Sequence, residues 1–488
     1  MRLPTLREID DELVRRDFAE FIKRFWGQVE QSMPLVWTWH FQVLADHFQA
    51  ITDGKIARIV VNIPPGHGKS IISAVLWPAW EWLTRPGLRS LFGSYAYGLA
   101  ERDSIRCREL IRSEEYRRLI PRKGSKPSWA LKPLPDRLDE FHNTAGGFRQ
   151  VYSSGGKATG LRGHKVVMDD PINVADANST GALREAIRIW DQSLSSRFVD
   201  PRAVQRVLIM QRLNVGDLAG HCLNVGGYDH LSLPSEARPL HKCCCPEGTA
   251  CSQRGGTSIG FVDPRDPGQL LNPVVSTADV IAQARRDLGS FGYAGQHDQM
   301  PTPLEGGLVR RENFGAYAQL PGTHGDWAQS WDLKGSASKL AGTSYCCGWV
   351  LFRPRGSANV YVVDRFRDRV GIVGAIGGIR RFSTLYPTAT IRVENKALGP
   401  AAIEMLHDEI PGVVADDPDG SKVQRFVACQ PMIEAGNVLV PEMAPWLDEF
   451  MDEITAFPNG LNDDQVDALT QQLLHWRAKP GGGKPWWT

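Results

Sequence analysis

Two segments of this chain carry residues that suit phosphate chemistry. Residues 56–70 read IARIVVNIPPGHGKS, a buried strand followed by a loop that ends in Gly68-Lys69-Ser70. In such a loop, backbone N–H groups and a helix N-terminus surround a phosphate, while Lys reaches phosphate oxygens and Ser reaches Mg²⁺. Residues 457–469 read FPNGLNDDQVDAL and place three carboxylates within five residues. The first segment indicates nucleotide hydrolysis, and the second indicates metal ions held for phosphodiester cleavage.

The nucleotide motif departs from the common pattern at its start. GxxxxGK[ST] requires Gly where this chain has Ile63, so the motif alone is also explained by a Gly/Pro turn with a solvated lysine. Residues 165–171, KVVMDDP, supply a strand that ends in two acids. Asp169 is suited to hold Mg²⁺ through its shell and Asp170 to polarise the attacking water, a position where Glu is common. Together the two segments predict nucleotide hydrolysis.

The C-terminal acids have two distant partners in the sequence. Asp332 interrupts a strand-like run, SWDLKG, and Glu394 ends another, ATIRVE. On a helix, Asp463 and Asp467 share one face and Asp464 is adjacent to Asp467, so the like charges repel unless a cation joins them. A two-metal nuclease needs acids of this kind from distant parts of the chain. The alternative is that acids near a helix N-terminus simply favour its dipole.

The elements around these motifs predict two α/β units. In the first half, strands alternate with helices, which indicates a largely parallel sheet covered on both faces. The five expected strands are 57–63, 90–96, 148–154, 165–170 and 206–212, after a helix at 11–30. A Gly/Pro/Cys-rich stretch at 234–273 and a short helical piece at 277–289 follow. From 325, three successive strands, a helix, a strand and two more helical regions predict a mixed α/β unit.

Length and composition limit the class of protein. A chain of 488 residues exceeds the size of a single core, so at least two domains are expected. Lys plus Arg number 56 and Asp plus Glu 55, so nucleic-acid binding would depend on a local basic patch. Arg365, Arg367 and Arg369 alternate along one strand-like run and are candidates for such a patch. The chain has no run of 18 apolar residues and its N-terminus lacks the apolar core of a signal peptide, so we expect a cytosolic protein.

One segment is rich in metal-ligating residues. HKCCCPEGTAC (241–251) contains His241, Cys243, Cys244, Cys245 and Cys251. These residues could bind zinc, but the CxxC spacing of common structural sites is only loosely met. The sequence therefore favours a solvent-exposed insertion loop over a zinc site.

The combined motifs resemble the large subunit of tailed-phage terminases, over roughly residues 35 to 475. PPGHGKS is similar to that family's deviant phosphate loop, which often begins with two prolines and lacks the first Gly. Residues 155–172 resemble its Gly-rich lead into the acidic strand. Residues 206–220 resemble the segment that couples hydrolysis to movement, with Gln211 and Arg212 at the strand end. Residues 94–109 resemble a further family segment, a strand followed by an Arg-bearing helix.

The resemblance implies a fold and a division of the chain. It implies an ATPase domain of the ASCE P-loop type with a parallel-rich sheet, and an RNase H-like mixed α/β nuclease domain. The expected limits are 1–235 for the ATPase domain with a helical segment at 1–50, 236–320 for a Cys/Gly/Pro-rich insertion and linker, 321–476 for the nuclease domain and 477–488 for a flexible tail.

The resemblance also implies site residues. The expected nucleotide-binding residues are Gln42, Pro65, Gly66, His67, Gly68, Lys69, Ser70 and Asp169, with Ser70 and Asp169 on the ATP-bound Mg²⁺. Related loops often carry Arg where this chain has Gly66, so the missing charge must come from elsewhere. Arg102 and Arg106 are candidates, although both would also suit a solvated helical face. Gln42 could read the adenine edge, whereas Trp37 and Trp39 suit core packing.

In the second domain, Asp332, Glu394 and the acids of NDDQVDAL resemble the three acidic motifs of the terminase nuclease. Asp464 is the first choice for the third metal ligand, with Asp463 next, and Mg²⁺ or Mn²⁺ is the expected ion.

The implied function is a viral DNA-packaging motor. ATP hydrolysis would drive double-stranded DNA into a procapsid, and the nuclease would cut concatemeric DNA. The implied partners are DNA, a portal protein, a small terminase subunit and other copies of the chain in a ring, in the host cytoplasm. A helicase-like repair or recombination ATPase with a fused nuclease is the alternative, but helicases usually need two motor domains and the chain has one phosphate loop. A capsid-associated protein with vestigial motifs would not be expected to retain all of these acids.

Overall fold

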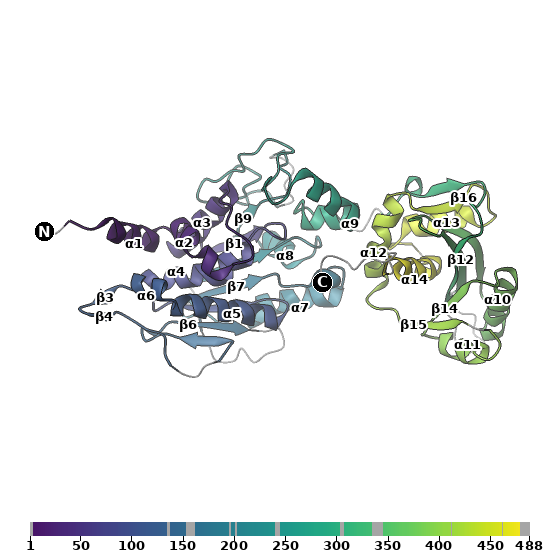
Figure 1. The fold of residues 1–488 in the computed structure, drawn as a ribbon, viewed down its shortest axis with the longest axis horizontal. Coiled ribbons are helices and arrows are strands. Elements are labelled where there is room, and N and C mark those ends of the chain that lie inside the picture. The colour runs from purple at the N-terminus through teal and green to yellow at the C-terminus, as the bar shows by residue number, and fades with distance from the viewer. Residues whose placement is uncertain are drawn as a thin grey trace. The chain divides into compact units, whose positions relative to one another are not determined.

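The computed structural model separates into two compact units, Met1–Gln283 with Tyr293–Thr302, and Ala284–Gly292 with Pro303–Thr488. It describes residues 3–133, 137–152, 162–194, 197–200, 203–239, 245–302, 307–333, 345–410, 412–460 and 462–478. The Gly-rich lead at 155–160, three of the predicted metal-ligating residues (His241, Cys243 and Cys244) and the tail from 479 lie outside these residues. The predicted domain limits stay a prediction. Each unit contains one large sheet (Figure 1).

The first unit is built on a seven-stranded sheet in the order β5-β6-β2-β7-β8-β1-β9. All neighbouring strands are parallel except β5 and β6, which confirms the predicted parallel-rich sheet. The strands are β1 (Arg58–Asn62), β2 (Arg89–Gly93), β5 (Glu140–His142), β6 (Phe148–Tyr152), β7 (Lys165–Asp169), β8 (Gln205–Met210) and β9 (Asp229–Ser232), with a small hairpin of β3 (Arg122–Lys123) and β4 (Lys126–Pro127) beside them. β8 therefore lies between the strand of the phosphate loop and the acidic strand.

Helices cover both faces of this sheet, because alternate residues of each strand point to opposite sides. In β1, Ile59 and Val61 belong to one hydrophobic cluster and Val60 to another. The helices are α1 (Leu6–Arg16), α2 (Phe18–Val29), α3 (Trp39–Thr52), η1 (Ile71–Leu76), α4 (Trp77–Thr84), α5 (Tyr97–Arg112), α6 (Glu114–Leu119), η2 (Val174–Asp176), α7 (Thr180–Arg188), η3 (Ile189–Ser193) and α8 (Leu218–Val225). A further helix, α9 (Ala278–Gln296), begins in this unit, but its part Ala284–Gly292 belongs to the second. The first cluster contains residues of α1 to α6, and the second contains residues of η3 and α8. This arrangement is that of a doubly covered α/β sheet.

The helix predicted at 11–30 is two helices. Asp17 has an extended backbone and accepts hydrogen bonds from the N–H groups of Ala19 and Glu20, which makes it the N-cap of α2. Asp is among the preferred N-cap residues because its side chain satisfies the free N–H groups of the first turn. The apolar stripe continues across this break, which is why periodicity alone did not reveal it.

The second unit contains a seven-stranded mixed sheet in the order β10-β16-β13-β12-β11-β14-β15. β11, β12 and β13 are antiparallel neighbours, and β14 pairs in parallel with β11 and β15. The strands are β10 (Gly315–Tyr317), β11 (Gly325–Leu333), β12 (Cys346–Pro354), β13 (Val360–Asp368), β14 (Thr390–Glu394), β15 (Val413–Asp416) and β16 (Val438–Pro441), preceded by η6 (Arg311–Asn313). The predicted mixed α/β unit is confirmed.

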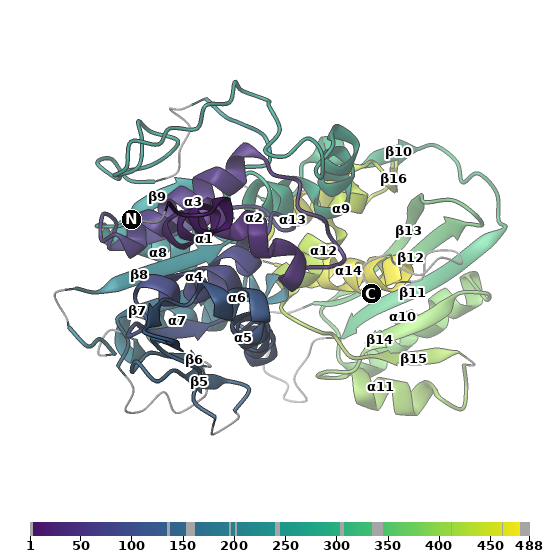
Figure 2. The same ribbon diagram turned by 60° about the vertical axis from the view of Figure 1, so that its left-hand side comes forward.

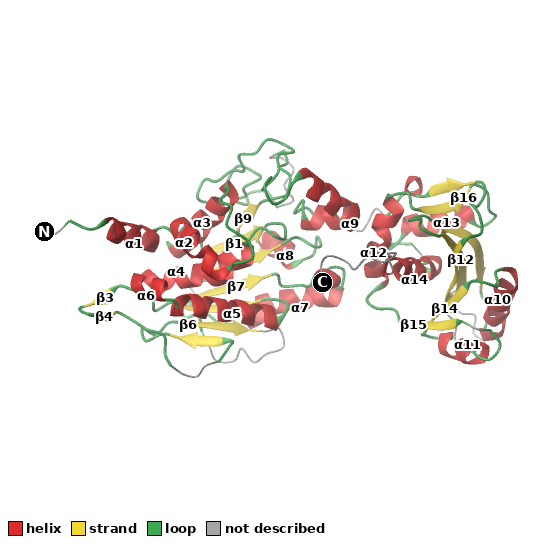
Figure 3. Ribbon diagram, viewed as in Figure 1, coloured by secondary structure: helices red, strands yellow, loops and turns green. Residues whose placement is uncertain are grey.

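Helices again lie on both faces of this sheet (Figure 3). They are α10 (Ile372–Leu385), α11 (Gly399–Leu406), α12 (Lys422–Glu434), α13 (Leu447–Ala456) and α14 (Asp464–Ala478). Figure 2 shows α10 and α11 on one side of the sheet and α12 and α14 on the other. In β12, Trp349 joins the cluster under α12 to α14, and Val350 joins the cluster under α10 and α11.

Among the described residues, no helix has both the length and the apolar character that a membrane span requires.

Candidate nucleotide and nuclease sites

The first candidate site lies at the carboxyl edge of the first sheet. β1 leads into residues 63–70, β7 ends at Asp169, and β8 lies between them and ends before Gln211. Because the carboxyl ends of parallel strands meet at one edge, the loop and both acids lie together. This edge is where open α/β sheets bind their ligands.

The phosphate loop depends on its glycines. Gly66 and Gly68 have φ values of 79° and 74°, a region that side-chain-bearing residues rarely adopt. A Cβ on Gly68 would lie 2.9 Å from Cη2 of Trp26 and 3.0 Å from Cε1 of Phe41. Trp26 of α2 and Phe41 of α3 therefore contact the loop closely and leave no room for a side chain at position 68.

His67, a predicted nucleotide contact, is buried in the protein. Its Nδ1 lies 2.9 Å from the carbonyl oxygen of Pro65, and its ring meets that of His40 edge-on at 5.5 Å. Burial is the main cause that lowers the pKa of both histidines, and that of His40 falls to about 3. The imidazole of His67 supports the loop from inside the unit as a neutral group.

Lys69 and Asp170 form the central ion pair of the site. Lys69 Nζ lies 2.8 Å from Asp170 Oδ1, and the lysine side chain is 8% exposed. The backbone of Asp170 is held on both sides, since its carbonyl accepts from Tyr95 N–H at 2.9 Å and its N–H donates to Ile209 at 2.8 Å. Its φ of 42° is unusual for a residue with a side chain.

Asp169 has the features of a metal ligand. It is buried, and its Oδ1 has no hydrogen-bond partner among the described residues. Burial, followed by the charge of Asp170, raises the pKa of Asp169 to about 7, while Lys69 and the Ser70 hydroxyl oppose the shift. An orphaned buried carboxylate oxygen beside a hydroxyl fits a hard divalent cation, whose charge would stabilise the ionised form. Ser70 and Asp169 are therefore suited to hold the metal ion of a bound nucleotide.

A pocket opens beside these residues, and two arginines line it. Its polar lining consists of Ser70, Ser94, Arg102, Asp103, Arg149, Asp169 and Asp170. Arg102 is half exposed and pairs with Asp103 at 3.0 Å, so the predicted candidate lies at the pocket in the same chain. Arg106 is not among the lining residues.

Arg149 was not predicted from the sequence. It is buried on β6, its Nη2 donates to the carbonyl of Ala74 at 3.1 Å, and its guanidinium lies 4.3 Å from the ring centroid of Phe92. Its Nε and Nη1 have no partner among the described residues. A single Arg in a strand matches no sequence motif, so only the fold reveals that Arg149 lies beside the pocket.

The remaining predicted nucleotide contact lies on α3. The amide of Gln42 donates to Asp46 one turn along the helix, at 2.9 Å. Trp37 stacks on Phe41, and Trp39 stacks on Phe261, which confirms core packing for both tryptophans.

The two predicted coupling residues have different surroundings. The backbone N–H of Gln211 points to Asp170 Oδ1 at 3.4 Å, so this residue borders the site. Arg212 instead turns into the protein, where its Nε lies 3.0 Å from both oxygens of Asp217. Asp217 also caps α8 by accepting from the N–H of Gly220. Arg212 therefore fixes the turn after β8, and its coupling role stays a prediction.

The second candidate site lies in the second unit, where Asp332 and Glu394 come from neighbouring parallel strands. β11 pairs with β14 up to Trp331 and Val393, so the two acids follow at the same end of the sheet. Both side chains are buried. A Cβ on Gly399 would lie 1.8 Å from the carbonyl oxygen of Glu394, so the turn after β14 requires glycine there.

The acids of α14 meet a pair of cations on α12. Lys422 Nζ lies 2.6 Å from Asp463 Oδ1 and also contacts Asp467, and Arg425 Nη2 lies 3.1 Å from Asp467 Oδ1. Arg425 Nη1 lies 3.9 Å from Glu394 Oε1, which links the helix acids to the strand acids. Asp464 is buried, and its Oδ2 faces the N–H of Tyr345 at 3.4 Å.

These contacts define what the second site can do. Asp463 and Asp467 pair with side chains of α12, and the Asp464 carboxylate contacts a backbone N–H. Asp332, Glu394 and Asp464 are buried carboxylates from two strands and a helix, and carboxylates are the ligands that hard divalent cations take. The metal-ligating role of each acid stays a prediction.

The predicted basic patch on β13 is wrong for two of its three arginines. Arg365 Nη1 lies 2.6 Å from Glu449, and Arg367 Nη2 lies 2.9 Å from Glu453. The Arg367 side chain is only 4% exposed. The two arginines bind α13 to the sheet, because alternation along a strand places them on the helix-covered face.

The fold and the sites define a P-loop ATPase unit joined in one chain to an RNase H-like nuclease unit. Residues 326–475 match the family model described as the terminase RNaseH-like domain. The second unit thus belongs to that domain family, and the predicted recognition of the chain as a terminase large subunit is confirmed over this unit. No match to a curated protein was found.

The chain also matches solved structures of phage terminases. The large terminase of a thermophilic bacteriophage in complex with ADP is 11% identical, covering 87% of this chain and 98% of that one, with a TM-score of 0.47. The large terminase of bacteriophage HK97 is 11% identical, with coverage of 94% and 99% and a TM-score of 0.34. The large terminase nuclease of the thermophilic phage G20c with bound magnesium is 16% identical, with coverage of 35% and 96% and a TM-score of 0.27.

Proposed function

We propose that this chain is the motor and nuclease subunit of a viral DNA-packaging machine. ATP hydrolysis in the first unit would drive double-stranded DNA into a procapsid, and the second unit would cut concatemeric DNA. The observation that carries the proposal is the presence of two separate sites in one chain, one built on a phosphate loop and one on carboxylates of a terminase nuclease fold. The single phosphate-loop sheet disfavours a helicase, which usually needs two motor domains.

The finer assignments follow from the chemistry of each site. ATP with Mg²⁺ suits Lys69, Ser70 and Asp169, and Mg²⁺ or Mn²⁺ suits Asp332, Glu394 and Asp464. The bound metal would neutralise charge on the phosphates. A portal protein, a small terminase subunit and a ring of identical chains are the proposed partners, in the host cytoplasm at the procapsid.

The Lys69–Asp170 ion pair suggests how the first site responds to nucleotide. When Lys69 exchanges Asp170 for a phosphate oxygen, the Asp170 carboxylate loses its cationic partner. It can then accept a hydrogen bond from the attacking water and orient it. Arg102, at the mouth of the same pocket, is suited to stabilise charge on the transferred phosphoryl group in place of the Arg that Gly66 lacks.

The two-site proposal is tested by paired variants of the full chain. Lys69→Ala should abolish ATP hydrolysis and leave Mg²⁺- or Mn²⁺-dependent DNA cleavage intact, while Asp332→Ala should do the reverse. Arg102→Ala should lower ATP hydrolysis, with Arg106→Ala as its matched control on the same helix.

Lys55→Ala and Asp326→Ala are the controls for the first pair, since Lys55 is exposed outside the loop and Asp326 is exposed at the start of β11. If either Lys69→Ala or Asp332→Ala removed both activities, the proposal of two separate sites would be wrong. Packaging by purified procapsids then separates translocation from simple hydrolysis, because only translocation protects DNA from an added nuclease.

A further inference from the structure

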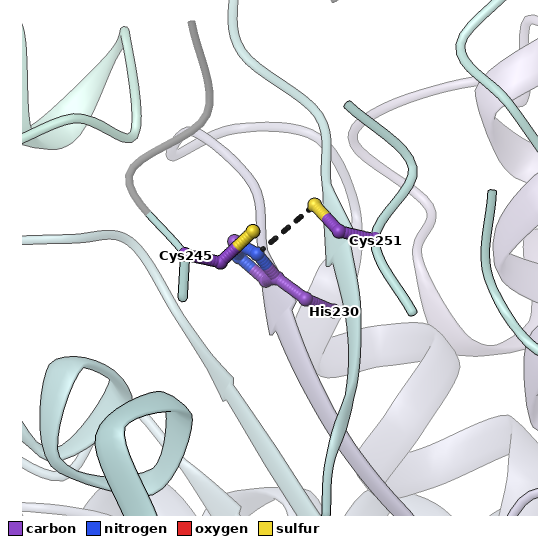
Figure 4. Close-up of side chains that lie close together, drawn as sticks. All are labelled: His230, Cys245 and Cys251. Atoms are coloured by element: carbon purple, nitrogen blue, oxygen red, sulfur yellow. Dashed lines mark hydrogen bonds between the residues drawn. The ribbon is translucent and has the colours of Figure 1, made fainter. Parts of the chain in front are cut away.

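Three metal-ligating side chains meet in the first unit, away from the phosphate loop's own pocket. His230 on β9, Cys245 and Cys251 each offer a ligand atom, and these atoms all lie within 4.8 Å of one another. Figure 4 shows both sulfur atoms beside the imidazole ring. His230 and Cys251 are fully buried and Cys245 is 3% exposed, so this group is part of the interior.

The backbone holds Cys251 beside His230. His230 N–H donates to the carbonyl of Ala250 at 2.8 Å, and Ser252 N–H donates to the carbonyl of His230 at 3.0 Å. The segment around Cys251 therefore runs along the outer edge of β9 as a short parallel bridge. Gln253 N–H then points to the Cys251 sulfur at 3.4 Å. The backbone on both sides of Cys251 thus fixes the position of its sulfur beside the His230 ring.

A further pair of hydrogen bonds fixes the tautomer of His230. Asn62 Nδ2 donates to the carbonyl of Met210 at 3.1 Å, so its Oδ1 is the atom that faces His230 Nε2 at 2.8 Å. An amide oxygen only accepts, so Nε2 carries the proton and Nδ1 is the nitrogen that faces the cysteines, 3.3 Å from Cys251 Sγ. Metal-bound histidines are typically oriented by a hydrogen bond of this kind from the other ring nitrogen.

The chemistry of the three ligands selects the metal. Thiolates and imidazoles are the ligands that zinc prefers, and a closed structural site combines four of them, with no open position for substrate. Two thiolates also cancel the charge of Zn²⁺, so the assembled group is neutral. Neutrality matters here because Cys245 and Cys251 belong to the apolar cluster on this face of the sheet, where an unpaired charge is costly.

We propose that His230, Cys245 and Cys251 bind a structural zinc ion that anchors the edge of the ATPase sheet. The described residues supply three of the four ligands that such an ion takes. Asn62, which orients His230, is the last residue of β1 and directly precedes the phosphate loop. The ion would thus connect the Cys-rich segment, the edge strand β9 and the start of the nucleotide site.

The sequence favoured an exposed insertion loop; Pro246, Glu247 and Gly248 are exposed, but Cys245 and Cys251 are buried. His230 was missed because it lies upstream of the Cys-rich segment and in a strand. The spacing of the cysteines alone cannot predict a ligand such as His230, which lies on the neighbouring edge strand β9.

Metal content of the purified full chain tests the site directly. Protein prepared under reducing conditions and dialysed against metal-free buffer should retain stoichiometric zinc by mass spectrometry of the elements. Cys251→Ser and Cys245→Ser should each lose most of it. Cys222→Ser is the matched control, since Cys222 is a buried thiol in the same cluster but outside the group of three, and it should retain zinc.

A second measurement does not depend on the folding of the cysteine variants. Titration of the wild-type chain with a mercurial reagent should release zinc in step with modification of buried thiols. Asn62→Ala should weaken zinc affinity by about 10- to 100-fold, the usual effect of removing a partner of a metal-bound histidine. Because Asn62 acts through His230, zinc affinity rather than ATP hydrolysis is its readout.

Three outcomes would overturn the proposal. The first is a wild-type chain free of zinc that also fails to bind added Zn²⁺ in a competition titration. The second is equal zinc retention by the wild type and Cys251→Ser. The third is a disulfide between Cys245 and Cys251 that persists in reductant, since it would remove both thiolates.

Discussion

At the residue scale, the two neighbouring acids that end β7 have opposite surroundings. Asp169 is buried, and burial with the nearby Asp170 raises its pKa to about 7. Asp170 instead is 26% exposed and contacts Lys69 at 2.8 Å. Two adjacent carboxylates with such different environments can take different roles. In the proposed assignment, the metal ligand and the water-orienting group are then adjacent residues of the chain.

The buried histidine pair under the phosphate loop predicts acid sensitivity. The pKa of His40 falls from 6.5 to about 3, mainly through burial and then through the charge of His67. Below pH 6.5 the unfolded chain binds a proton at His40 and the folded chain does not, so the free energy of unfolding falls as the pH falls towards 3. The maximum loss is about 1.4 kcal/mol per pH unit.

We expect His40→Gln to flatten the acid side of the stability–pH profile of the first unit, measured by denaturant unfolding. Part of the slope should remain, because burial also lowers the pKa of His67 and His47. The exposed His407 provides the control, and His407→Gln should leave the profile as it is. Equal profiles for His40→Gln and the wild type would contradict the linkage.

At the element scale, α12 positions the acids of the nuclease site. Lys422 and Arg425 lie one turn apart on this helix and contact Asp463, Asp467 and Glu394. The helix therefore supplies positive charge where like charges of α14 and β14 would otherwise repel. It was not predicted from the sequence, since the run KVQRFVACQPMIE contains Pro431 and a weak apolar stripe.

Removal of the Arg425 charge should destabilise the second unit. Arg425 and Asp467 are both nearly buried, and breaking one side of a buried pair typically costs about 3–5 kcal/mol. Because Lys422 still contacts Asp467, we expect Arg425→Met to lower the free energy of unfolding by about 3 kcal/mol. Added Mg²⁺ should restore part of the loss by screening the acids.

Denaturant unfolding, followed by a signal from the second unit, measures this loss of unfolding free energy. Arg380→Met removes an exposed pair with Glu409 and should cost no more than about 1 kcal/mol. Similar losses in both variants would show that Arg425 does not compensate buried charge.

The sequence predicted strands better than it predicted contacts between them. All five strands expected in the first unit are present, because continuous apolar runs bounded by Gly and polar residues are local signals. β9 and β16 are only four residues long and were missed. The direction of Arg212, the burial of His67 and the pairing of Arg367 depend on tertiary packing, which no spacing rule encodes. Asp332 and Glu394 were predictable because an acid within or directly after an apolar strand is unfavourable unless a partner or a metal ion stabilises its charge.

At the scale of the whole molecule, the chain has two units, each with its own sheet and its own hydrophobic clusters. A chain of this kind need not unfold in a single two-state transition. Ligands then stabilise the unit that binds them.

We expect calorimetry to resolve two unfolding transitions. A non-hydrolysable ATP analogue with Mg²⁺ should raise the midpoint temperature of only one of them. At a ligand concentration of 100 times Kd the gain is about 2.7 kcal/mol, or roughly 4–5 °C for a unit of this size. Lys69→Ala should abolish that shift and leave the other transition unchanged. A single transition that moves as a whole with nucleotide would contradict this prediction.

The backbone of Asp170 sets a limit on how the phosphate-loop site can change by mutation. Its φ of 42° lies in a region that Asp and Asn enter more readily than longer side chains. Glu is common at the corresponding position of related ATPases, yet Asp170→Glu would place a longer side chain on a backbone that disfavours it, with the Lys69 contact to rebuild. Asp170→Glu, a substitution usually regarded as conservative, is therefore unfavourable at this position. A glutamate here would require the backbone of the whole turn to change.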